Sequence, residues 1–162
     1  MFPDAEGLRP TPDRVRETLF NWLGQDLNGK RCLDLFAGSG ALGFEAASRG
    51  AAEVAMVENN HAAFRALQEN SRKLGYDNVA LYCEDGVGFA RRLDPGRYDV
   101  IFVDPPFSRG MLPEVLPLLA PVLAEDGLVY VESGEAFDPG PTWQVFRRAK
   151  AGVVHYQLLQ LA

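Results

Sequence analysis

Apolar runs and amphipathic stretches alternate along most of the chain. Short continuous apolar runs, rich in β-branched and aromatic side chains, are typical of buried strands, whereas apolar positions three and four residues apart are typical of helices. The pattern predicts helices at residues 12–23, 41–50, 61–74, 86–93 and 110–124. It predicts strands at residues 31–36, 52–58, 78–83, 98–103, 127–133, 142–149 and 152–160. Residues 1–10 are expected to be irregular.

Capping residues mark several ends of these helices. Thr11 is expected to cap the first helix, with Pro12 at its first helical position. Asn60 is expected to cap the third helix, and Gly75 to stop it. The fifth helix contains several prolines, so the pattern leaves its bounds open.

The order of these elements predicts one α/β domain over residues 1–162. Strands that alternate with helices form a Rossmann-like, doubly wound and mostly parallel sheet that is covered on both faces. The last two strands are joined by a tight link at 150–152, which predicts an antiparallel hairpin at one edge of a seven-stranded sheet. Ligands of such sheets bind beyond the carboxyl ends of the strands, so the residues just after the first four strands are the candidates for function.

Composition and charge limit the classes of function. The hydrophobic content of 47% and the charged content of 23% are ordinary for a globular domain, and the net charge of −6 weighs against broad attraction to nucleic acid. The sequence shows no signal-peptide pattern and no apolar run as long as a membrane span, so we expect a cytoplasmic protein without a membrane partner. We also expect a monomer. Cys32 and Cys83 fit neither a disulfide framework nor a zinc site, so we expect two buried thiols and no metal.

A glycine-rich turn follows the first predicted strand. Gly38, Gly40 and Gly43 have the G-x-G-x-x-G spacing, and Glu58 ends the next strand about 20 residues after the first glycine. Glycines let the backbone approach a ligand closely, and an acid at this distance binds ribose hydroxyls. The pattern therefore favours a nucleoside cofactor over a tight turn without a ligand. Neighbouring residues expected in the same site are Phe36, Ser39, Asn59 and Gly86.

The glycine motif fits both NAD and S-adenosylmethionine, because each presents an adenosine ribose. Two acidic positions favour S-adenosylmethionine. Asp34 lies in the strand before the turn, where its carboxylate can receive an amino-acid ammonium or order the loop, and where it would repel a pyrophosphate. Asp85, in the pair Glu84-Asp85 after the third strand, can accept the amine of an adenine. Capping the helix that follows is an equally good role for Asp85.

The fourth strand ends in Asp104-Pro105-Pro106-Phe107. Prolines fix the backbone and remove N–H donors, so the turn is rigid. The Asp104 carboxylate and the Pro105 carbonyl can accept both hydrogens of a planar amine and direct its lone pair at a sulfonium methyl group. Phe107 can stack on the base that carries the amine. These four residues are the predicted catalytic motif, and they would act mainly by positioning.

Three segments together resemble one enzyme family. "GLRPTPDRVRETLFNWL", "LDLFAGSGALGFEAASRGA" and "FVDPPF" are similar to the bacterial small-subunit ribosomal RNA guanine-N2 methyltransferases of the RsmD type, which are class I S-adenosylmethionine-dependent methyltransferases. The likeness runs from about Gly7 to Tyr156. The glycine loop alone is specific only to the superfamily, whereas the amino-terminal segment is much more specific to the family.

The resemblance implies a class I methyltransferase fold and S-adenosylmethionine as the cofactor. It implies that the methylated amine is N2 of a guanine in 16S ribosomal RNA, free or in a small ribosomal subunit assembly particle. Gly38, Ser39, Gly40 and Glu58 would contact the cofactor, and Asp104 to Phe107 the target base. Residues that the resemblance assigns to the RNA and cofactor entrance are Arg9, Thr11, Arg14 and Arg16. On the predicted helix, Arg14 and Arg16 point in different directions, so we expect only one of them to touch a ligand.

Family members usually carry a further basic stretch, rich in Arg and Gly, before the "RPT" segment. The sequence here begins at Met1-Phe2-Pro3 without that stretch. Either its start is truncated or this member holds RNA differently. We expect cofactor binding to survive without the basic stretch, which leaves RNA binding by this chain open.

Three other functions fit parts of the sequence. An adenine-N6 methyltransferase acting on DNA or RNA would also use an Asp-Pro-Pro-aromatic motif, although 162 residues leave no room for a separate target-recognition region. An NAD-dependent oxidoreductase would use the same glycine spacing. A non-catalytic nucleoside-binding or assembly module would keep the cofactor site and need no Asp104.

Overall fold

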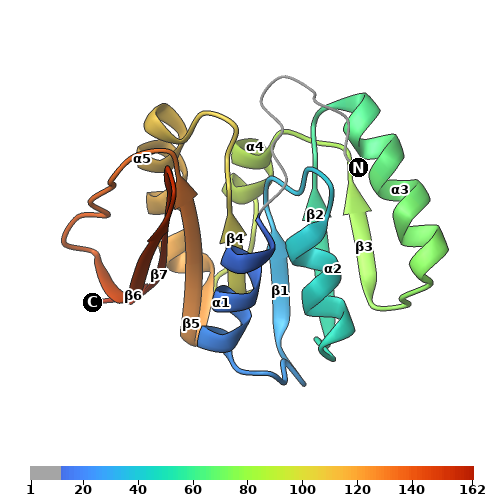
Figure 1. The fold of residues 1–162 in the computed structure, drawn as a ribbon, viewed down its shortest axis with the longest axis horizontal. Helices are drawn as coiled ribbons and strands as arrows, with labels where there is room; N and C mark the ends of the chain where they lie inside the picture. The colour runs from blue at the N-terminus through green and yellow to red at the C-terminus, as the bar shows by residue number, and fades with distance from the viewer. Residues whose placement is uncertain (1–11) are drawn as a thin grey trace.

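A computed structural model describes residues 12–162 of the chain. Its helices are α1 (Asp13–Leu23), α2 (Ala41–Ser48), α3 (His61–Leu74), α4 (Gly86–Arg91), α5 (Ser108–Leu119) and the 3₁₀ turn η1 (Ala120–Val122). Its strands are β1 (Arg31–Asp34), β2 (Glu53–Val57), β3 (Val79–Tyr82), β4 (Tyr98–Val103), β5 (Leu123–Ser133), β6 (Trp143–Ala151) and β7 (Val154–Leu161). Figure 1 shows the strands as one twisted sheet with helices on both sides.

Within the described residues, the strands form one seven-stranded sheet in the order β3-β2-β1-β4-β5-β7-β6. Strands β1 to β5 pair in parallel, whereas β7 pairs antiparallel with both β5 and β6. The predicted doubly wound α/β fold with an antiparallel edge hairpin is confirmed. The chain winds outward in opposite directions from β1 and β4, so the carboxyl ends of these two strands flank the crevice where such sheets bind ligands.

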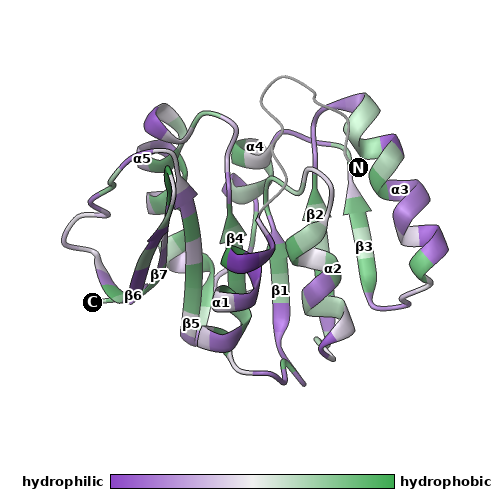
Figure 2. Cartoon of the chain, viewed as in Figure 1, coloured by the Kyte–Doolittle hydropathy of each residue, from purple (hydrophilic) through white to green (hydrophobic). Residues whose placement is uncertain are grey.

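Two hydrophobic cores lie on the two faces of the sheet. Helices α1, α2 and α3 cover one face, where Leu19, Phe44 and Leu67 pack in one cluster with Phe102 of β4. Helices α4 and α5 cover the other face. The buried residues of this second cluster include Val87, Phe89, Leu112, Val115, Leu116, Ile101 and Val103. Successive residues of β4 therefore alternate between the cores, and Figure 2 shows this central strand as hydrophobic while α3 carries hydrophilic residues on its outer side.

Helix ends agree with the capping signals in most places. Asn60 caps α3 by accepting a hydrogen bond from the N–H of Ala63, and Gly75 ends the helix in the left-handed conformation. The start of α1 differs from the prediction by one residue. Pro12 is the N-cap and not the first helical residue, because its backbone is extended and its carbonyl accepts the first hydrogen bond, from the N–H of Arg16.

Strand β5 begins earlier than its apolar pattern predicts, at Leu123 instead of residue 127. Leu123 pairs with Tyr98, and the pairing then shifts register before it continues with Leu128 opposite Val100. Asp126 within the shift has a positive φ of 62°. The polar residues of this irregular part read as a turn in the sequence, which is why the pattern misses it.

The prediction of two buried thiols is correct for Cys32 and wrong for Cys83, which is exposed. Cys83 follows β3, an edge strand whose residues are at most half-buried. An apolar run on an edge strand therefore does not bury its last residue. Among the described residues, no helix has the length and apolar character needed to cross a membrane.

Candidate active site

The glycine turn connects β1 to α2 and takes conformations that require glycine. Gly38 and Gly40 have φ values of 55° and 84°, and Gly40 is the N-cap of α2. A Cβ atom on Gly40 would overlap the Phe44 ring and lie 2.6 Å from Cδ1 of Leu67. A Cβ atom on Gly43 would lie 2.6 Å from the sulfur of Met56 on β2. The motif therefore brings α2 close to the sheet and leaves the turn open above β1.

Asp34 is the last residue of β1 and is buried beneath this turn. One of its carboxylate oxygens accepts a hydrogen bond of 3.0 Å from the N–H of Gly43, so Asp34 orders the start of α2. Burial raises the pKa of Asp34 to about 7, and the Glu58 and Glu132 carboxylates add to this while the Gly43 N–H opposes it. At neutral pH a cation in the site would favour the ionised form of Asp34.

Glu58 follows β2, and two backbone donors hold its carboxylate. Oε1 accepts a hydrogen bond of 2.9 Å from the N–H of Gly38, and Oε2 accepts one of 2.9 Å from the N–H of Asn60. The side chain is buried, with 7% of its surface exposed. Each carboxylate oxygen can accept a second hydrogen bond, so Glu58 is fixed in place and still able to bind hydroxyl groups.

The third and fourth strands end beside the same opening. Glu84 forms an ion pair with Arg92, and the neighbouring Asp85 caps α4 by accepting a hydrogen bond of 3.0 Å from the N–H of Gly88. After β4, Pro105 is buried whereas Pro106 is exposed. Phe107 then serves as the N-cap residue of α5 and exposes 67% of its surface.

A cavity of about 290 Å³ joins these strand ends. The predicted site residues that line it are Asp34, Phe36, Gly38, Ser39, Glu58, Asn59, Gly86, Asp104, Pro105 and Pro106. Residues that line it without having been predicted are Pro12, Leu35, Ala37, Ala41, Leu42, Val57, Ala63, Ala66, Asn70, Glu84, Glu132 and Val154. No cluster of His, Cys, Asp and Glu able to hold a metal ion exists in the described part of the chain.

Glu132 lies one strand beyond Asp104 on the same face of the sheet. Phe102 pairs with Tyr130, so the residues two positions further, Asp104 and Glu132, follow on the same face of adjacent parallel strands. Glu132 has 7% of its surface exposed and accepts a hydrogen bond of 2.7 Å from the Tyr130 hydroxyl. Burial, followed by the charge of Glu132, raises the pKa of Tyr130 well above its usual value, so Tyr130 stays protonated and donates.

Comparisons with known proteins place this chain in a family. The model of the family described as "Conserved hypothetical protein 95" matches residues 1–160. Ribosomal RNA small subunit methyltransferase D of Escherichia coli K12 is 45% identical, over 98% of this chain and 82% of that protein. The protein of the same name from Haemophilus influenzae is 37% identical, over 97% of this chain and 85% of that protein. The chain belongs to the RsmD family of methyltransferases.

Solved structures agree with membership of the RsmD family. The structure described as a putative methyltransferase yhhF from E. coli has a TM-score of 0.86 and 43% identity, and the match covers 96% of this chain and 88% of that one. A Salinibacter ruber RNA methyltransferase in complex with S-adenosyl-L-homocysteine has a TM-score of 0.74, over 93% of this chain and 92% of that one. Its identity of 19% supports the fold alone, which is that of class I methyltransferases.

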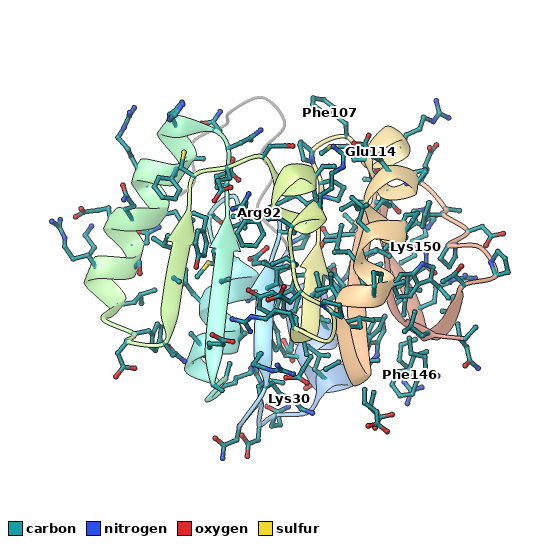
Figure 3. All side chains as sticks on the ribbon, turned by 180° about the vertical axis from the view of Figure 1, so that it is seen from behind. Lys30, Arg92, Phe107, Glu114, Phe146 and Lys150 are labelled. Carbon is teal, nitrogen blue, oxygen red and sulfur yellow. The ribbon has the colours of Figure 1, made fainter. Side chains whose placement is uncertain are left out.

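The structure of this RsmD-family member does not bring every predicted site residue to the cavity. Gly40 is buried at the helix cap, and the Asp85 carboxylate is engaged with Gly88. Phe107 is exposed, and Figure 3 shows it at the edge of the molecule. Of the acidic pair after β3, the residue at the cavity is Glu84. The role of Asp85 in binding adenine therefore stays a prediction, with helix capping as its observed contact.

Of the four predicted RNA-entrance residues, two lie on the described helix α1 and two do not. Arg9 and Thr11 lie outside the described residues. Arg14 is exposed on α1, whereas Arg16 forms ion pairs of 3.1 Å with Asp13 and 3.8 Å with Glu45. The amino end of α1 does reach the site, because Pro12 lines the cavity.

Proposed function

We propose that this chain transfers a methyl group from S-adenosylmethionine to the exocyclic N2 amine of a guanine in 16S ribosomal RNA. The observation that carries the proposal is the pair of carboxylates of Asp104 and Glu132, on adjacent strands at the rim of the same cavity. Phe107 stands exposed beside them.

The acidic lining of the cavity supports S-adenosylmethionine over NAD. Asp34, Glu58 and Glu84 all face the cavity, and three carboxylates disfavour the negative charges of a pyrophosphate. The same residues fit the groups of S-adenosylmethionine. Glu58 would accept hydrogen bonds from the ribose hydroxyls, Asp34 would face the ammonium, and Glu84 or Asp85 would receive the adenine amine. The bound cofactor would supply a methyl group on a positively charged sulfur.

Two acceptors side by side favour guanine over adenine as the target. The Watson–Crick edge of guanine presents the N2 amine next to the N1–H donor. With Asp104 accepting from the amine, Glu132 would accept from N1–H. Adenine presents an acceptor at N1, which a carboxylate would repel, so the adenine-N6 alternative is the weaker one.

The chain would promote the transfer mainly by holding the amine in position. Asp104 and the Pro105 carbonyl would accept the two N2 hydrogens, which localises the nitrogen lone pair and directs it at the methyl carbon. The transfer would form a nitrogen–carbon bond as the carbon–sulfur bond breaks, and the electron pair of the carbon–sulfur bond would stay on sulfur. The methylated nitrogen then releases a proton to Asp104 or to water. Phe107 would hold the base by stacking.

The relatives support ribosomal RNA as the substrate, because the E. coli and H. influenzae proteins are both named as methyltransferases of small-subunit ribosomal RNA. The test incubates the protein and labelled S-adenosylmethionine with unmethylated small subunits, free 16S RNA and DNA in parallel, followed by digestion to nucleosides. We expect labelled N2-methylguanosine from an RNA substrate. Labelled N6-methyladenosine would favour the adenine alternative, and protection against thermal unfolding by NAD but not by S-adenosylhomocysteine would favour an oxidoreductase.

A further inference from the structure

The cations of β6 differ from most other cations of the described chain. Ion pairs with carboxylates engage Arg16, Arg31, Arg49, Arg72, Arg91, Arg92, Arg97 and Arg109. Within residues 12–162, by contrast, no carboxylate forms an ion pair with Arg148 or Lys150. In a chain with a net charge of −6, positive charges that no carboxylate pairs with form a local surface that suits an anionic partner.

Strand register places these cations together on one face of the hairpin. Arg148 pairs with Gln157, and Lys150 pairs with His155. Because side chains two residues apart point to the same face of a strand, Arg148 and Lys150 share a face with their two partners. We call Arg148, Lys150 and His155 the β6–β7 basic surface.

Arg148 is held in place before any ligand arrives. Its guanidinium donates a hydrogen bond of 3.2 Å to the side-chain oxygen of Gln157, which is buried with 2% of its surface exposed. The amide nitrogen of Gln157 in turn donates to the carbonyl of Phe137 at 2.8 Å. Arg148, His155 and Gln157 line a surface cleft with residues 136–138, where the Asp138 carboxylate accepts the N–H of Gly140. Such fixed geometry reduces the entropy lost on binding.

This surface lies at the carboxyl end of β5, on the α5-covered face of the sheet and on the opposite face from the side chains of Asp104 and Glu132. Strand β7 pairs with β5 so that His155 lies opposite Ser133, the residue after Glu132. Val154, the neighbour of His155, points to the other face of the strand and lines the cavity, so the two sites meet around the edge of β7. Figure 3 shows Lys150 between the edge of the molecule that carries Phe107 and the opposite part that carries Phe146. Phe107 begins α5, which covers this same face, so a strand of RNA that delivers a base to Phe107 can extend along that face over the hairpin.

We propose that the β6–β7 basic surface binds the phosphate backbone of the RNA on one side of the target base. The inference takes its substrate class from the proposed function. Lys150 supplies a compact charge, and Arg148 supplies a planar fork that matches phosphate oxygens. Contacts of this kind set the register of the RNA without reading its sequence. Arg147 is not part of the surface, because it pairs with Leu158 on the opposite face and lies over the Phe146 ring.

The experiment compares two double variants that lose the same charge. Arg148→Gln with Lys150→Gln removes cations of the surface, and Lys30→Gln with Lys73→Gln removes exposed cations elsewhere; Figure 3 shows Lys30 at the edge opposite Phe107. Initial rates of methylation are measured over a range of RNA and salt concentrations. The first variant should raise KM for RNA roughly 25-fold at about 0.1 M salt, because two phosphate contacts are lost. Its salt-dependence slope should fall by about 1.4, with kcat and S-adenosylhomocysteine affinity unchanged.

The outcomes separate this inference from the proposed function. If the wild-type protein is active and the two double variants have the same KM for RNA, the surface proposal is overturned and the proposed function stands. If the wild-type protein methylates no RNA substrate, the proposed function is overturned and the surface proposal with it. Lys150→Gln alone changes an exposed residue and is not expected to disturb folding. It should give about half the change in salt slope that the double variant gives. An unchanged slope for Lys150→Gln overturns the role of Lys150.

Discussion

The two halves of the cavity are built in different ways. On the β1–β2 side, backbone N–H groups hold the carboxylates of Asp34 and Glu58, and close packing around Gly40 and Gly43 fixes the turn. On the β4–β5 side, the turn after Asp104 is stiffened by prolines and ends in an exposed aromatic ring. The first half is a closed frame for a small molecule, and the second is a rigid edge open to a large one. Variants in the two halves should therefore separate cofactor binding from methyl transfer.

The largest separation is expected for Asp104→Ala. The variant loses an acceptor for the target amine, so kcat/KM for RNA should fall by about 1000-fold or more. The affinity for S-adenosylhomocysteine, measured by calorimetry, should stay within about twofold of wild type, because the frame that surrounds Glu58 is intact. Asp94→Ala, at an exposed acid away from the cavity, is the matched control. Retained activity in Asp104→Ala would remove the motif from catalysis and favour a non-catalytic module.

The packing of the closed half is tested by Gly40→Ala against Gly75→Ala. Both glycines have a positive φ, of 84° and 71°, so both variants share the backbone cost of about 1 kcal/mol. Only at Gly40 does the new Cβ meet neighbours, the side chains of Phe44 and Leu67. Gly40→Ala should therefore lower the free energy of unfolding by about 1–3 kcal/mol more than Gly75→Ala does. Urea denaturation measures both, and equal losses would contradict the close packing of the turn.

Glu58→Ala should lower the cofactor affinity, whereas Asp104→Ala lowers the rate of methyl transfer. Loss of the carboxylate removes the expected ribose contact and leaves the Gly38 and Asn60 donors without their acceptor. We expect S-adenosylhomocysteine to bind about 1–3 kcal/mol more weakly. At saturating cofactor, kcat should change much less than the cofactor affinity. Unchanged affinity in calorimetry would exclude Glu58 from the cofactor site.

The smallest effect, and the most specific one, is expected for Glu132→Gln. The amide keeps an acceptor for the Tyr130 hydroxyl but removes the charge that favours a guanine N1–H donor. The kcat/KM for RNA should fall roughly tenfold, which corresponds to about 1–2 kcal/mol of lost transition-state stabilisation, and the cofactor affinity should not change. Glu135→Gln, three residues away and exposed, is the control. If only the cofactor affinity falls, Glu132 acts in cofactor binding and not in binding the target base.

The parts of the site that the sequence predicts are those specified by local motifs. Gly38, Glu58 and Asp104 each follow a strand whose apolar pattern is clear, so their place at one edge of the sheet follows from parallel pairing alone. The fold is predictable for the same reason. The hairpin link and the rule that short connections join neighbours predict that β6 and β7 pair, but they do not predict that β7 is the strand next to β5.

What the sequence leaves open depends on side-chain direction and strand register. Glu132 is an acid at the end of an apolar run, a signal that Glu58 shares, but its nearness to Asp104 requires the register of β4 and β5 after an irregular start. The choice between Glu84 and Asp85 depends on which of the two caps α4. Cys83 was misplaced because an apolar run does not reveal that its strand lies at the edge.

The pairing of β7 with β5 also affects how the protein is completed during synthesis. The strand that carries Glu132 gains its second neighbour only when residues Val154–Leu161, which follow it in the chain, have left the ribosome. The cofactor half, whose strands are all translated earlier, can assemble before then. A nascent chain that stops short of β7 would leave β5 as an unpaired edge with free backbone donors and acceptors. Competence to bind the cofactor should thus precede competence to methylate, because β7 is translated after β1 to β5.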